Sequence, residues 1–181
     1  MLQRVLDEQA GLPHSYPDVG VTRGSAPPGY VTDHHRVRLG NGAAVFERAK
    51  DLVLSWHMFR TGWVELCWPD APVEEGTTVG VLGRALGLWH LGACRIVYRV
   101  ERMGPLETFG FAYGTLPGHP LRGEERFMVE WRHEDDSVWY DVLAYSRPGS
   151  LLLRMGWPVL RRFQRRFAAD SLCAMARGLR R

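Results

Sequence analysis

The chain has 181 residues, of which 45% are hydrophobic and 24% charged, and its formal net charge at pH 7 is +3. This composition is typical of a globular domain and excludes a disordered chain. No apolar run approaches the ~20 residues that a membrane helix needs, so stable membrane insertion is not expected.

The net charge and the cysteines exclude further classes of partner and site. The net charge is too small for phosphate-driven binding, so a nucleic-acid partner is not expected. Cys67, Cys94 and Cys173 are far apart and lack zinc-site spacing, which predicts reduced, partly buried thiols and neither a metal nor a cofactor. The first residues have early acids and no apolar segment of the signal-peptide kind, so the cytoplasm is the expected location.

The N-terminal stretch, residues 1–29, is predicted to be a surface leader. Glycine and proline recur in it too often for a regular element. Tyr16, Val19 and Tyr30 are the residues that we expect to attach it to the domain. Residues 30–181 are then predicted to form a single domain.

The domain begins with a strand and a helix. Residues 34–40 alternate as a strand does, and Asn41 is placed to cap the helix that follows. From Val45 to Trp56 the apolar residues recur every three or four positions, which predicts an amphipathic helix. Gly62 ends any continuation.

Beyond the helix the hydrophobic period changes to two. The segments "RIVYRVE", "ETFGFAYG", "RFMVEWR" and "SVWYDVLAY" follow one another at short spacing, which predicts an antiparallel meander. In the first of them, Ile96, Tyr98 and Val100 are expected on one face. Glycines in the preceding strands predict bulges or bends, and therefore a strongly curved sheet.

A long amphipathic helix is predicted from about Pro158 to the end of the chain. Its apolar face carries Leu160, Phe163 and Phe167, and its arginines lie mostly on the other face. The curved sheet is the large apolar surface left to cover this stripe. The sequence therefore predicts an α+β helix-grip fold, in which the sheet wraps around the C-terminal helix and can leave a cavity between them.

Three segments resemble a known family: "YVTDHHRVRLGNG", "FAYGTLPGHPLRGEERF" and "VWYDVLAYSRPGSLL". They are similar to the uncharacterised family called domain of unknown function 1990, also uncharacterised protein family 0548. The resemblance covers nearly the whole chain and implies a START-like helix-grip fold. Members of that superfamily often bind lipids, sterols or other apolar molecules, but the resemblance implies no established reaction.

The segment "GTLPGHPLRGEE" admits two interpretations. His119 titrates near neutrality and either Glu124 or Glu125 could orient it, which would make a catalytic acid–base site. The alternative is a wide hairpin loop whose path is fixed by prolines and glycines and whose glutamates are solvated or cap backbone groups. No nucleophile or metal ligand accompanies these residues, which favours the loop.

Seven tryptophans exceed what the core of such a chain needs, and large aromatics commonly line apolar pockets. The adjacent His34 and His35 point to opposite faces of a strand, so one of them can face a cavity. The predicted ligand-binding residues are His34, Trp89, Tyr98, Phe111, Tyr113, His119, Trp131 and Tyr140.

The function that follows from the sequence is binding of a small hydrophobic or amphipathic molecule in the cavity. The alternative is an enzyme of the cyclase, dehydratase or hydrolase type that uses His119 with Glu124 or Glu125. A third interpretation is an interaction protein that docks through the arginine-rich helix. The ligand, any reaction and the oligomeric state stay open.

Overall fold

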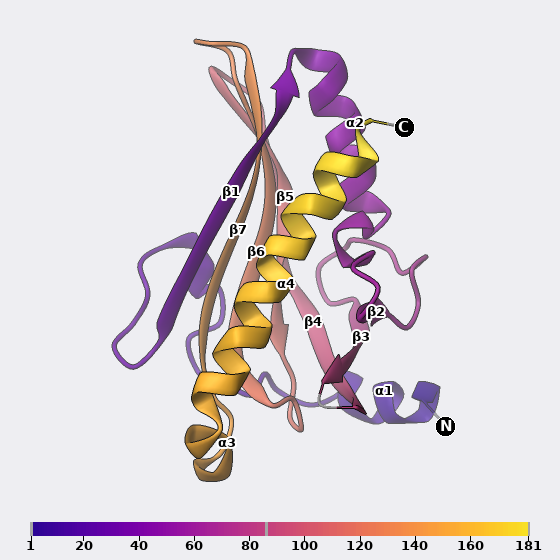
Figure 1. Ribbon diagram of the computed structural model, residues 1–181, viewed down its shortest axis with the longest axis vertical. Coiled ribbons are helices and arrows are strands. Elements are labelled where there is room, and N and C mark those ends of the chain that lie inside the picture. Colours follow the sequence, from indigo (N-terminus) through magenta and orange to yellow (C-terminus); the bar gives the residue numbers. More distant parts are fainter. Residues whose placement is uncertain (1, 86, 181) are drawn as a thin grey trace.

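The computed structural model describes residues 2–85 and 87–180, which form one curved antiparallel sheet with the two longest helices along its concave side (Figure 1). The elements run in this order: α1 (Leu2–Ala10), η1 (Val21–Arg23), β1 (Val31–Asn41), α2 (Ala43–Leu54), η2 (His57–Phe59), β2 (Val64–Leu66), β3 (Thr78–Ala85), β4 (Leu88–Arg102), β5 (Leu106–Thr115), β6 (Leu121–Arg132), β7 (Ser137–Pro148), α3 (Leu151–Met155) and α4 (Trp157–Gly178).

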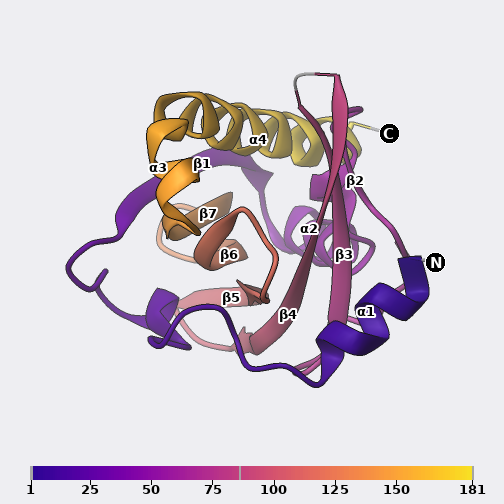
Figure 2. The same ribbon diagram turned by 90° about the horizontal axis from the view of Figure 1, so that it is seen from below.

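The seven strands pair in the order β1-β7-β6-β5-β4-β3-β2, and every pair is antiparallel. The predicted meander is therefore present from β2 to β7, and β1 joins it beside β7. Seen along the strands, the sheet curls around α4 (Figure 2). The helix-grip fold predicted from the sequence is confirmed by this arrangement.

Helix α4 closes the concave side because its apolar stripe has no other surface to cover. Pro158 lies in its first turn, where a missing N–H costs nothing. Further along, the Phe167 ring packs against Phe59 with centroids 5.3 Å apart. In the last third of the helix Ser171 and Met175 are buried.

One half of the concave surface is filled by α2 and the turn η2. Phe46, Val53 and Phe59 from this segment are buried in the main core. Trp56 lies between α2 and η2 in the left-handed region, with φ 52°, and its indole N–H donates to the Ala71 carbonyl at 2.8 Å. The helix is capped by Gly42 and not by Asn41 as predicted, because β1 continues through Asn41, which pairs with Ser137.

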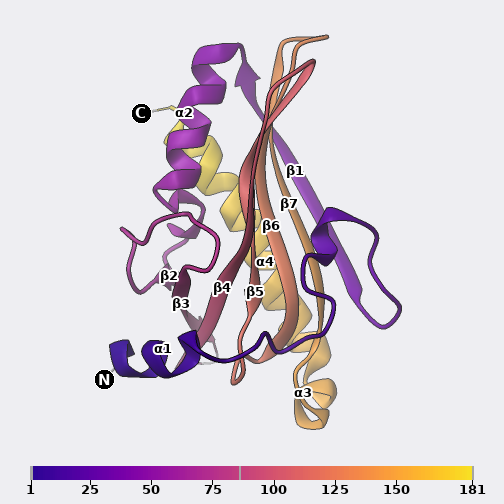
Figure 3. The same cartoon turned by 180° about the vertical axis from the view of Figure 1, so that it is seen from behind.

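The leader crosses the convex side of the sheet (Figure 3). The prediction that it has no regular element was wrong, since α1 is a helix whose last carbonyls are bonded. The Arg95 guanidinium donates to the carbonyls of Gln9, Ala10 and Leu12, which supplies partners that a helix end lacks. Among the expected attachment points, Tyr16 is buried, whereas Val19 is 48% exposed.

A β-bulge between Ile96 and Tyr98 changes the faces predicted for β4. Ile96 belongs to the main core on the concave side. The Tyr98 hydroxyl instead lies 2.8 Å from Oγ1 of Thr22, a residue of the leader. The two residues that the alternation placed on one face therefore lie on opposite faces.

Among the described helices, none is long and apolar enough to cross a bilayer.

Candidate functional site: a cavity between the sheet and α4

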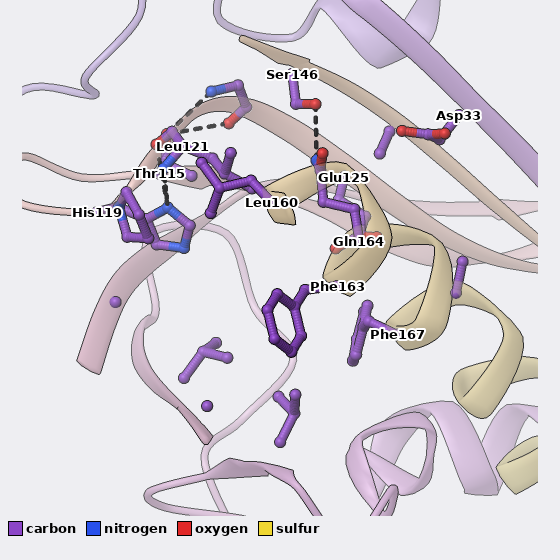
Figure 4. A pocket seen from close by; sticks show the side chains of 18 of the residues that line it. Asp33, Thr115, His119, Leu121, Glu125, Ser146, Leu160, Phe163, Gln164 and Phe167 are labelled. Atoms are coloured by element: carbon purple, nitrogen blue, oxygen red, sulfur yellow. Dashed lines mark hydrogen bonds between the residues drawn. The ribbon is translucent and has the colours of Figure 1, made fainter. Parts of the chain in front are cut away.

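A cavity of about 500 Å³ lies between the concave face of the sheet and the first half of α4 (Figure 4). It occupies the half of the concave surface that α2 and η2 leave uncovered. Exposed residues among its lining, His90 and Val159, place its mouth near the beginning of α4. The curvature of the sheet and the length of α4 together create this space.

The wall contributed by α4 is apolar. Leu160, Phe163 and Phe167 line the cavity at helical spacing, and each of them keeps part of its surface accessible. Val142 and Ala144 of β7 line the sheet side. A ligand in this space would therefore exchange water for hydrocarbon over most of its surface.

A carboxyl group lies in this apolar space. Glu125 of β6 is paired in register with Tyr113 of β5, and the Tyr113 hydroxyl donates to Glu125 Oε2 at 2.8 Å. Burial raises the pKa of Glu125 to about 7, although the bond from Tyr113 opposes this effect. The same burial, together with the charge of Glu125, raises the pKa of Tyr113, so the phenol keeps its proton.

The imidazole of His119 forms another part of the wall. Its Nδ1 lies 3.0 Å from both the amide nitrogen and the carbonyl oxygen of Leu121, which fixes the ring plane. The ring passes over Gly92, where a Cβ would overlap it and come within 2.7 Å of Nε2. Burial lowers the pKa of His119 to about 4, so the ring is neutral at pH 7.

Two polar contacts tie α4 to the sheet along the cavity. Arg161 holds the Asp33 carboxylate with two N–H groups, and its Nη2 donates to Oδ1 at 2.6 Å. Gln164 Nε2 donates to Ser146 Oγ at 2.8 Å. Asp33 lies on β1 and Ser146 on β7, so the two contacts fasten the helix to neighbouring strands.

Glu124 and Glu125 lie within β6 and not in the loop expected from the sequence, so their side chains point to opposite faces of the sheet. The turn between β5 and β6 spans only residues 116–120. The expectation of a wide loop was wrong, because the alternating pattern of both strands continues further than the sequence suggested. Of the two roles expected for the glutamates, solvation does not hold for Glu124, which instead accepts hydrogen bonds from the backbone amides of Gly20 and Thr22.

The Glu124 carboxylate points to the convex side and is 3% exposed. Its Oε2 accepts from the Tyr16 hydroxyl and from the Gly20 amide, each at 2.7 Å. Its Oε1 accepts from the Thr22 amide at 3.0 Å and from the Thr22 hydroxyl. Gly114 makes room for this arrangement, since a Cβ there would overlap the Tyr16 hydroxyl. Glu124 therefore anchors the leader, and its carboxylate is not directed toward His119.

Two of the eight predicted ligand-binding residues, Tyr113 and His119, line the cavity. Phe111 and Tyr140 lie in the core, where Phe111 contacts Trp56 and the Tyr140 hydroxyl lies 3.0 Å from Ser171 Oγ. Both belong to the half of the concave face that is filled by other side chains. Their aromatic rings therefore pack against other side chains of the core and do not line the cavity.

The other predicted residues lie elsewhere on the molecule. Tyr98 is on the convex side because of the bulge, and Trp131 packs against Phe46 and His133. Trp89 is 53% exposed beside Arg84, because β4 extends past the wrapped part of the sheet.

His34 and His35 do point to opposite faces, as predicted, but His35 is the one that lines the cavity. His34 Nε2 lies 2.5 Å from Asp141 Oδ2 on the convex side. The register of β1 against β7 decides this, because His35 pairs with Val142, a cavity residue. Sequence alternation alone does not tell which of the two faces is concave.

Phe163, Phe167 and Asp33 are cavity residues that were not predicted as ligand contacts. The signal for the two phenylalanines was present in the stripe of α4, which we expected to be core. Asp33 carried no such signal, since its role depends on Arg161, 128 residues away in sequence. Within the described residues, no three His, Cys, Asp or Glu side chains are grouped in a way that could hold a metal ion.

Comparisons with known proteins agree with the resemblance seen in the sequence. The family described as Domain of unknown function (DUF1990) matches residues 15–174. A UPF0548 protein of Dictyostelium discoideum is 35% identical over 160 residues, which cover 83% of this chain and 73% of that one. A UPF0548 protein of Deinococcus radiodurans is 36% identical over 166 residues, which cover 85% and 81%.

Among solved structures, a hypothetical protein of Helicobacter pylori superimposes with a TM-score of 0.48 at 9% identity, over 87% of this chain and 93% of that chain.

Proposed function

The chain belongs to the family described as Domain of unknown function (DUF1990), and we propose that it binds a small hydrophobic or amphipathic molecule in the cavity between the sheet and α4. The observation that carries the proposal is an apolar cavity of about 500 Å³ with a few converging polar groups. Small-molecule sites commonly have volumes of ~300–1,000 Å³ and this kind of lining.

Burial of ligand hydrocarbon supplies the binding free energy. Each Å² of apolar surface removed from water is worth roughly 25 cal/mol before the costs of association are subtracted. Leu160, Phe163 and Phe167 provide the wall against which this surface is buried. Glu125, Tyr113 and His119 are the polar groups that orient the ligand.

The proposal is tested by native mass spectrometry of the purified protein and by titration with Nile red, a neutral dye that fluoresces in apolar surroundings. We expect a retained small molecule, or saturable dye binding at one site per chain, by the folded protein at neutral pH. Phe163→Asp places a charge in the cavity wall and should abolish dye binding, whereas Arg165→Asp on the exposed side of α4 should not. Dye binding that appears only during partial unfolding would contradict the proposal.

An enzyme on the same fold is the second candidate, and the observation that favours it is the pKa of Glu125, about 7. General acid–base catalysis works best when the pKa of the group lies near the working pH. Of the three residues first considered for this role, Glu124 is bonded to the leader and the pKa of His119 is about 4, which leaves Glu125.

Mass spectrometry separates the two candidates. If the protein only binds its ligand, the wild type and the Glu125→Gln variant should release the same molecule, in different amounts. An enzyme that depends on Glu125 should release product from the wild type and unreacted substrate from the variant.

A further inference from the structure

Acidic side chains line part of the cavity. Among the described residues that line it there is no lysine and no arginine, whereas Asp33 and Glu125 are present. The nearby Arg161 already holds Asp33 through both of its terminal nitrogens. Its positive charge is therefore matched before any ligand arrives.

The histidines do not reverse this balance. Burial keeps His119 neutral at pH 7, because its pKa is lowered to about 4. His90 is exposed and His35 is half-buried. Within the described residues, neither of these two histidines forms a hydrogen bond or an ion pair with Glu125.

The carboxyl of Glu125 has unused hydrogen-bonding capacity. Tyr113 donates to Oε2, and within the described part of the chain the other oxygen, Oε1, has no hydrogen-bond donor. A carboxylate can accept several hydrogen bonds, and those from charged donors are about twice as strong as neutral ones. Burial makes an unpaired carboxylate costly, which is why its pKa is raised.

Resting on the proposed function, we infer that the cavity selects amphipathic amines: the ammonium group of the ligand pairs with Glu125, and its apolar part lies against Phe163 and Phe167. A cation relieves the cost of the buried carboxylate, because it supplies both the opposite charge and the missing donor. A fatty acid would bring a second carboxylate beside that of Glu125, and the nearby cation, Arg161, is already paired with Asp33. A neutral alcohol would make one hydrogen bond without the charge.

The test compares dodecylamine, dodecanol and dodecanoate, three probes with one tail and different head groups, as competitors of Nile red at pH 8. The wild-type protein should bind dodecylamine at least about tenfold more tightly than dodecanol, as expected for a charge-assisted hydrogen bond. Dodecanoate should bind more weakly than dodecanol. This ranking needs no variant and therefore does not depend on the folding of one.

The variant Glu125→Gln tests whether Glu125 is the residue that causes the preference for the amine. It keeps the shape of the side chain and removes the charge, so dodecylamine should bind no more tightly than dodecanol. Glu130→Gln is the matched control, because Glu130 lies on the same strand and pairs with Arg36 outside the cavity. The control should keep the full preference for the amine.

Two results overturn the inference in different ways. If the three probes bind equally, or dodecanoate binds best, the amine preference is wrong and the binding function stands. If none of the probes displaces the dye and the dye itself does not saturate, both the inference and the proposed function fail.

Discussion

His119 and Gly92 face each other so closely that residue 92 has no room for a side chain. A Cβ at this position would overlap the imidazole, with Nε2 only 2.7 Å away. His119 belongs to the turn between β5 and β6, and Gly92 lies in β4. The contact therefore holds the turn against the wall of the cavity.

Gly92→Ala should destabilise the protein by about 1–3 kcal/mol, the usual cost of inserting a methyl group into a filled space. The cost should fall sharply when His119 is also replaced by alanine, because the overlapping ring is then gone. Urea unfolding of the two single variants and the double variant measures this coupling. Additive effects of the two substitutions would show that the cost of Gly92→Ala does not come from overlap with the His119 ring.

Glu125 and His119 should give the stability of the protein opposite pH dependences. The folded carboxyl of Glu125 has a pKa of about 7 against an ordinary 4.5, so it binds a proton more tightly than the unfolded chain does. Stability is then lost as the pH rises from about 4.5 to about 7, by about 3 kcal/mol in full. His119 has a pKa of about 4 against 6.5, so stability is lost as the pH falls through that window.

The two contributions offset each other between about pH 4.5 and 6.5, and single variants should reveal them. Relative to the wild type, Glu125→Gln should gain stability as the pH rises from 4.5 to 7. His119→Gln should gain it as the pH falls from 6.5 to 4. Urea unfolding across this range measures both differences, and a constant difference for either variant would contradict the assigned environment of that residue.

Glu124→Gln should release the leader. The amide of glutamine would present a donor to the hydroxyls and amides of Tyr16, Gly20 and Thr22, which need an acceptor. We expect a loss of about 2–3 kcal/mol in stability, as for buried hydrogen bonds to a charged group. Trypsin should also cleave after Arg23 faster than in the wild type. Glu65→Gln, at an exposed position, is the control and should change neither property.

Phe167 and Phe163 should differ in their effect on stability. Phe167 packs against Phe59 and Phe127, so Phe167→Ala should cost about 2–4 kcal/mol. Phe163 contacts Trp63 and the open cavity, so Phe163→Ala should cost less and mainly weaken dye binding. Arg165→Ala should stay within about 0.5 kcal/mol of the wild type. Equal melting temperatures of the two phenylalanine variants would contradict the difference in packing.

The fold could be predicted from the sequence because its signals are local. Alternation in β5, β6 and β7 and the stripe of α4 are each contained in a short window, and together they leave one way to bury the apolar surface. The faces of β4 were predicted less well, because the bulge between Ile96 and Tyr98 depends on pairing with β5 and leaves no pattern in its own segment.

The site was harder to predict, because aromatic content does not tell which rings remain beside an empty space. Phe111 and Tyr113 lie on the same strand and face and both belong to the main core, yet Phe111 is covered by Trp56 whereas Tyr113 also lines the cavity. The difference arises because the chain just after α2 places Trp56 over Phe111. The role of Glu124 was also hidden, since its partners lie more than 100 residues earlier in the chain.

The position of that carboxylate has a consequence for how the protein is made. The ribosome makes the leader before β6, but the oxygens that accept hydrogen bonds from Tyr16, Gly20 and Thr22 belong to a residue more than 100 positions later. Domains fold during synthesis as their parts emerge. The contacts with Glu124 therefore cannot form until β6 has been synthesised and has paired, so residues 16–22, although made before the sheet, are among the last to reach their final partners.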